Sequence, residues 1–170
     1  TWHFNNNPQT YYNVCPYCTI NSANTTEHIL PKEVYPEYAV NVLNLIPTCS
    51  ECNTSKGDDV LDKNGEIFTI NFYTDTLPDI RYLFARITSI EGGVQFEYYL
   101  ENRNGVDVNL YVLLERHFQR FHLIDRFYDK AVQELSNIEN YFKFEEITCE
   151  AEYDKVANKL IRKTDADAIA

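Results

Sequence analysis

Two CxxC pairs, Cys15/Cys18 and Cys49/Cys52, are the clearest chemical signal in this chain. Thiolates are soft ligands, and four of them complete the tetrahedral shell of Zn²⁺ without leaving a position open to water or substrate. The spacing therefore predicts a structural zinc site. A disulfide framework fits less well, because the cysteine count of 5 is odd and leaves Cys149 alone. Reduced thiols of this kind favour a cytoplasmic location.

Hard oxygen ligands lie inside and beside the loop between the cysteine pairs. Glu27 offers a carboxylate oxygen and Asn53 an amide oxygen, and both ligand types suit Mg²⁺ or Mn²⁺. His28 follows Glu27 directly, and adjacent side chains on a strand point to opposite faces. His28 would then be free to take a proton from water. These residues predict a second, divalent metal site, although a zinc-held structural module with incidental polar residues stays open.

The order of these residues resembles that of the HNH endonucleases, which share a ββα-metal fold. The resemblance covers about residues 13–58 and rests on Glu27-His28, Asn44 and Asn53 within the cysteine frame. It implies that Glu27 and Asn53 bind a catalytic Mg²⁺ or Mn²⁺ ion. It further implies that His28 activates the attacking water, and that Asn44 orients His28 and braces the loop between the strands. The implied reaction is hydrolysis of phosphodiester bonds.

Substrate and partners are implied by the same resemblance. DNA is the more usual substrate of this family, and RNA stays open because nothing in the sequence reads bases. Bacterial HNH proteins that stand alone often resemble effector subunits of antiphage systems, in which an ATPase partner supplies substrate recognition. Nucleic acid and a protein partner are therefore both expected.

The charge balance disfavours strong unaided binding to nucleic acid. The net charge is -11, which repels a phosphate backbone at long range. This charge keeps a second interpretation open, a non-catalytic zinc-stabilised module that docks on a larger protein. The sequence contains no apolar run long enough to cross a bilayer, so a membrane partner is not expected.

The elements that position these residues suggest an α+β fold in two parts. Residues 1–64 are rich in Asn, Thr, Pro and Cys, and should form short strands and loops that a metal holds together. Residues 65–170 should form a hairpin and a helical extension that packs with the first part as one unit. Lys56 is expected at the surface of the helix after Cys52 or against a phosphate.

The second part divides further by its apolar periodicity. Residues 66–73 alternate as a strand does, and 82–90 and 94–102 flank a Gly-Gly turn and predict a hairpin. Residues 104–142 are helical, with a break near "FHLID" where Asp125 is a candidate cap, and 150–163 predict a last helix. Two helical stripes are expected to pack in the core, with a partner-binding groove as the alternative: Leu110, Leu114, Phe118 and Phe121, then Ile124, Tyr128, Ala131, Leu135, Ile138 and Phe142. The basic residues beside them, Arg116, Arg120 and Lys130, are assigned to solvated helix surface or to phosphate contacts.

Overall fold

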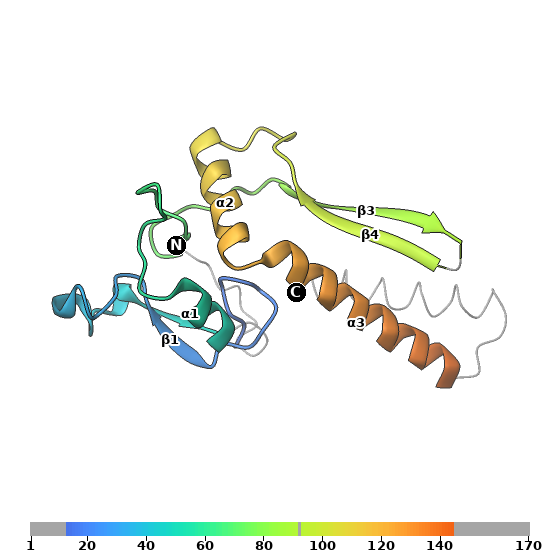
Figure 1. Ribbon diagram of the computed structural model, residues 1–170, viewed down its shortest axis with the longest axis horizontal. Helices are drawn as coiled ribbons and strands as arrows, with labels where there is room; N and C mark the ends of the chain where they lie inside the picture. The colour runs from blue at the N-terminus through green and yellow to red at the C-terminus, as the bar shows by residue number, and fades with distance from the viewer. Residues whose placement is uncertain (1–12, 92, 145–170) are drawn as a thin grey trace.

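The computed structural model describes residues 13–91 and 93–144, and it contains both helices and strands as the sequence predicts. In chain order the elements are β1 (Thr25–His28), η1 (Pro36–Tyr38), η2 (Val42–Asn44), β2 (Leu45–Thr48), α1 (Ser50–Lys56), β3 (Leu83–Ile90), β4 (Gly93–Leu100), α2 (Val108–Arg120) and α3 (Leu123–Phe144). Figure 1 shows the β1–β2–α1 unit at one end, with the β3–β4 hairpin and α3 extending away from it. Cys149 and the predicted helix at 150–163 lie outside the described residues.

The β1–β2–α1 unit is built from very short elements. Strands β1 and β2 pair antiparallel, with Glu27 opposite Ile46 and His28 opposite Leu45. The connection between the strands contains η1 and η2, and the Asn41 side chain accepts a hydrogen bond from the Leu43 amide as the N-cap of η2. This ββα order confirms the expected α+β architecture.

The predicted hairpin is present, but the predicted strand before it is wrong. Strand β3 pairs along its whole length with β4. Residues 66–73 instead form irregular chain, with one isolated bridge between Leu61 and Ile67. Burial does not follow their alternation either, because Thr69 is buried together with Phe68 and Ile70. The Ile70 amide donates to His117 Nδ1 at 3.3 Å, so a helix side chain takes the place of a partner strand.

The predicted break in the helical region lies between α2 and α3. Asp107 caps the start of α2 by accepting from the amides of Asn109 and Leu110. Helix α2 ends at Arg120, and His122 adopts a left-handed φ of 51° before α3 begins. Asp125 lies within the first turn of α3, so the expectation that it caps this helix is wrong.

The two apolar stripes have different outcomes. Leu114, Phe118 and Phe121 of the first stripe are buried, as predicted. In the second stripe Tyr128 is 44% exposed and Leu135 is 38% exposed. The expectation of full core packing is therefore wrong for these two residues. Helix α3 extends away from the core (Figure 1), and the Tyr128 ring lies against Phe96 of β4, with ring centroids 4.8 Å apart, instead of entering the core.

The core joins the zinc-binding segment to the helices. Tyr17, between the first two cysteines, stacks on Phe121 at the end of α2 with ring centroids 4.8 Å apart. His117 Nε2 donates to the Tyr17 carbonyl oxygen at 2.8 Å. Burial lowers the pKa of His117 to about 4, so this imidazole is neutral and bridges two parts of the core. Within the described ranges, no helix combines the length and the apolar character needed to span a bilayer.

Candidate active site and zinc site

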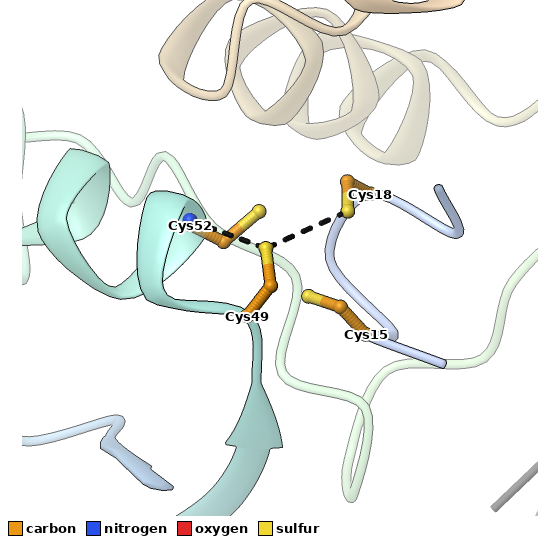
Figure 2. A group of neighbouring side chains, drawn as sticks. All are labelled: Cys15, Cys18, Cys49 and Cys52. Atoms are coloured by element: carbon orange, nitrogen blue, oxygen red, sulfur yellow. Dashed lines mark hydrogen bonds between the residues drawn. The ribbon is translucent and has the colours of Figure 1, made fainter. Parts of the chain in front are cut away.

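The four predicted zinc ligands form one buried cluster. Figure 2 shows Cys15 and Cys18 on the loop before β1, facing Cys49 and Cys52 at the start of α1. All four Sγ atoms lie within 4.8 Å of one another, and the Cys18 and Cys49 sulfurs are 3.9 Å apart. A tetrahedral zinc with Zn–S bonds of about 2.3 Å places its sulfurs roughly 3.8 Å apart. The donor set therefore fits a structural zinc ion.

The protonation of the cysteines shows why this cluster favours a cation. A hydrogen bond from Cys15 holds the pKa of the Cys18 thiol far below its usual range. The hydrogen bond with Cys18 raises the pKa of Cys15 to about 11, and the hydrogen bond with Cys15 raises the pKa of Cys52. The crowded sulfurs thus stabilise the Cys18 thiolate at the expense of those of Cys15 and Cys52. A dication removes this competition because it stabilises all four thiolates together.

Short-range contacts place the second cysteine pair. Cys49 is the N-cap of α1, and its sulfur accepts from the Cys52 amide at 3.4 Å. Asn24 Oδ1 accepts from both the amide and the hydroxyl of Ser50 at 2.9 Å, which ties the start of α1 to the chain before β1. The first turn of α1 is therefore fixed before any metal contact is counted.

Glu27, an expected metal ligand, forms a buried ion pair with Lys56. The Lys56 Nζ lies 2.9 Å from Glu27 Oε1, and the two side chains are 1% and 6% exposed, respectively. The same Nζ donates to the carbonyl oxygens of His28 and Gly57 at 3.0 and 3.3 Å. The expectation that Lys56 lies at the helix surface or on a phosphate is wrong. The sequence indicated this position only by spacing: Lys56 follows Asn53 by three residues, which places both on the same face of α1.

The electrostatics of Glu27 reflect two opposing effects. Burial raises the pKa of Glu27, while the hydrogen bond and charge of Lys56 act to lower it. The backbone amide of His28 also acts to lower the pKa of this carboxyl group. Glu27 lines a cavity as well, so its carboxylate could bind a divalent ion there.

His28 ends β1 and turns its ring toward the β1–β2 connection. Its Nε2 lies 3.1 Å from the carbonyl oxygen of Ala39. A carbonyl oxygen only accepts hydrogen bonds, so Nε2 carries the hydrogen and the neutral ring has its lone pair on Nδ1. This arrangement gives His28 a defined proton-accepting atom.

Asn44 holds the β1–β2 connection together through side-chain hydrogen bonds to its backbone. Its Oδ1 accepts from the Leu30 amide at 2.7 Å, and its Nδ2 donates to the carbonyl oxygens of Leu30 and Tyr38 at 3.0 and 3.1 Å. Tyr38 directly precedes Ala39, whose carbonyl holds His28. The residues that Asn44 and His28 contact, Tyr38 and Ala39, are therefore neighbours in the same loop.

Three of the four predicted active-site residues, all but Asn44, line one cavity. Glu27, His28 and Asn53 line a cavity of about 250 Å³, together with Glu33 and Asp58. Asn53 Nδ2 donates to the Thr25 hydroxyl at 3.2 Å, which orients the side-chain amide. The cavity thus brings a carboxylate, an amide and an imidazole together, and the first two are hard oxygen donors suited to Mg²⁺ or Mn²⁺.

Two arginines of α2 are paired with acidic residues instead of standing free for phosphate. Arg116 contacts Glu66 at 2.8 Å, and Arg120 contacts Asp59 at 3.1 Å. Arg120 also donates to the Lys56 carbonyl at 2.6 Å, at the end of α1. These contacts bind α2 to the chain that follows α1.

Comparison with known proteins defines the class of the first part of the chain. Residues 15–59 match the family model for HNH endonuclease, and these residues are an HNH domain with a four-cysteine cluster. No solved structure matches the chain. The fold class and the recognised family agree with the expectation from the sequence.

Two curated relatives match the same part of the chain. Protein ea31 of Escherichia phage lambda is 33% identical over 58 residues, which cover 34% of this chain and 17% of that protein. Septu protein PtuB of Bacillus thuringiensis is 42% identical over 50 residues, which cover 26% of this chain and 20% of that protein. The matches therefore span about a fifth of each relative.

Proposed function

We propose that this chain is a divalent-metal-dependent endonuclease that hydrolyses phosphodiester bonds of nucleic acid, DNA in preference to RNA. The observation that carries this proposal is the single cavity lined by Glu27, His28 and Asn53. An HNH match at residues 15–59 supports it. The preference for DNA follows family resemblance.

Each residue around the cavity has a role that fits its contacts. His28 accepts a proton from the attacking water at Nδ1, because Ala39 occupies Nε2. A carboxylate oxygen of Glu27 and the amide oxygen of Asn53 would hold Mg²⁺ or Mn²⁺. When bound, such an ion neutralises charge on the scissile phosphate and on the departing 3′ oxygen. Asn44 is a positioning residue that holds the loop carrying the Ala39 carbonyl.

Substrate recognition is assigned to a protein partner. The net charge of -11 opposes phosphate binding, and Arg116 and Arg120 are already paired with carboxylates. We therefore extend the proposal to a cytoplasmic effector subunit of an antiphage system with an ATPase partner. The match to a Septu protein supports this extension, and the four free, buried cysteines suit a reducing compartment.

A matched pair of histidine variants tests the nuclease proposal. Cleavage of plasmid DNA and of RNA is measured in Mg²⁺ and in Mn²⁺ for wild type, His28→Ala and His122→Asn. His122 is exposed and has a left-handed φ that Asn tolerates, so it serves as the control. Loss of a general base should slow cleavage by about 100-fold or more, with the control unchanged. Equal cleavage by His28→Ala would exclude His28 as the base.

A non-catalytic docking module is the second candidate, and one feature favours it. The β1–β2 connection exposes several large apolar side chains: Val34, Val40, Val42 and Leu43 are 61%, 87%, 72% and 62% exposed. Apolar side chains gathered in this way often contact another protein. A zinc-loaded chain that cleaves nothing with either ion, yet co-elutes with a larger protein from its native source, would favour this function over hydrolysis.

A further inference from the structure

Arg126 of α3 reaches the cysteine cluster from outside the HNH match. Its Nη1 lies 3.3 Å from Cys52 Sγ, and its Nη2 lies 3.9 Å from Cys49 Sγ. Nη2 also forms an ion pair with Glu51 at 2.9 Å, and Nη1 donates to the Phe121 carbonyl at 3.3 Å. The guanidinium is thus held on several sides and directed at two of the four sulfurs.

The corner between α2 and α3 brings Arg126 to this position. The left-handed residue His122 turns the chain, and Phe121 and Leu123 on either side are buried. Phe121 stacks on Tyr17 between the first two cysteines. The first turns of α3 are therefore packed against the cluster, and the Arg126 side chain is 11% exposed.

A guanidinium at this position suits a zinc-bound set of thiolates. Four thiolates and one Zn²⁺ carry a net charge of about −2, which is costly in a buried cluster without a nearby cation. The guanidinium of arginine stays protonated in proteins, so Arg126 supplies a permanent positive charge beside these sulfurs. Charged donors also form stronger hydrogen bonds than neutral ones, and the planar fork can serve two sulfurs at once.

We infer that Arg126 is a positioning residue of the zinc site, whose hydrogen bonds to the Cys52 and Cys49 sulfurs make zinc retention depend on α3. The four ligands come from the HNH domain, and this donor comes from a helix that the family match does not include. Groups that hydrogen-bond to metal ligands commonly contribute a factor of about 10–100 to metal affinity. The inference requires zinc in the cluster but does not require nuclease activity.

Zinc affinity of the full chain tests this inference directly. A chromogenic chelator competes for zinc with three zinc-loaded proteins: wild type, Arg126→Ala and Arg116→Ala. The amount of zinc transferred to the chelator is measured at equilibrium and over time. Arg126→Ala should bind zinc about 10–100-fold more weakly than wild type. Arg116→Ala removes an arginine whose ion pair with Glu66 lies outside the cysteine cluster, and its zinc affinity should be unchanged.

Two further variants separate a contact with sulfur from simple packing of α3. Arg126→Lys keeps the charge, but one ammonium cannot serve both sulfurs and Glu51, so its affinity should be intermediate. Glu51→Gln removes the ion pair and leaves the sulfur contacts, so its affinity should stay near that of wild type. If Glu51→Gln loses as much affinity as Arg126→Ala, the ion pair and not the sulfur contact is responsible, and the inference is overturned.

Co²⁺ substitution keeps the test informative if Arg126→Ala folds poorly. Thiolate-to-Co²⁺ charge-transfer bands report four-cysteine coordination without relying on the packing of α3. A titration of these bands should show the same ranking of variants as the zinc competition. Equal affinities for wild type and Arg126→Ala in both assays would overturn the inference. A wild type that binds neither ion would instead remove the zinc assignment itself.

Discussion

Replacing Lys56 by methionine would expose the cost of the buried ion pair beneath the proposed metal site. Methionine keeps an unbranched apolar side chain but has no charge, so Glu27 loses the counter-charge that lies 2.9 Å away. Removing one partner of a buried pair costs about 3–5 kcal/mol, because the other charge stays buried without compensation. The His28 and Gly57 carbonyls lose the same donor, so the upper part of this range is expected.

Urea unfolding of the zinc-loaded protein, followed by far-ultraviolet circular dichroism, measures this loss. At fixed zinc concentration, the midpoint temperature in a parallel thermal scan should fall by about 10 °C. Lys32→Met is the matched control, because Lys32 lines the same cavity but its side chain is 57% exposed. Its free energy of unfolding should change by about 0.5 kcal/mol at most. The Lys56→Met loss should also be smaller at pH 5 than at pH 8, since a protonated Glu27 has no charge to leave unpaired.

A double-mutant cycle with Glu27→Gln decides whether the two residues are coupled. Once Lys56 is gone, neutralising Glu27 should recover part of the lost stability, with a coupling energy on the order of 2 kcal/mol. If Glu27→Gln costs the same with and without Lys56, the pair contributes nothing specific. A Lys56→Met loss below about 1 kcal/mol would likewise refute the reasoning from burial.

Three other predictions follow from particular residues. Burial lowers the pKa of His117 from 6.5 to about 4, so its contribution to stability is complete above about pH 6.5 and is lost as the pH falls toward 4. The pH-stability curves of wild type and His117→Gln should differ by about 3 kcal/mol across that window, and parallel curves would refute it. Asn44→Ala removes three hydrogen bonds and should lower the free energy of unfolding in urea by about 2–4 kcal/mol. The control Asn41→Ala, at an exposed helix cap, should lower it by about 1 kcal/mol. Equal losses would count against the bracing role of Asn44. Gly57→Ala should cost about 1–3 kcal/mol by the same measurement, because φ is 58° and ψ is -153°, and an unchanged midpoint would contradict this.

Local patterns were sufficient for the zinc cluster and the hairpin. The type and spacing of Cys15, Cys18, Cys49 and Cys52 specify a four-thiolate site without knowledge of the rest of the chain. Alternation on both sides of a short turn likewise predicts β3 and β4, because each strand finds its partner next to it in sequence. The roles of Glu27, His28, Asn44 and Asn53 stay predictions, although the first, second and fourth line one cavity.

Long-range contacts account for the expectations that were wrong. Residues 66–73 alternate in sequence as a strand does, yet the hydrogen-bonding partner of Ile70 is a histidine on a helix far along the chain. The second helical stripe is apolar, but Tyr128 and Leu135 remain exposed where α3 extends beyond the core. Periodicity reports which face of a segment is apolar, and it does not report what that face will meet.

Residue chemistry read along the chain was thus enough to predict the four-cysteine cluster, because ligand preference belongs to each side chain. Where those side chains end up depended on the folded molecule. Lys56 looks like any helix-surface lysine in the sequence, and Arg126 like any helix-surface arginine. The fold buries the first against Glu27 and brings the second within reach of Cys52, because desolvation and charge pairing act between residues that are distant in sequence.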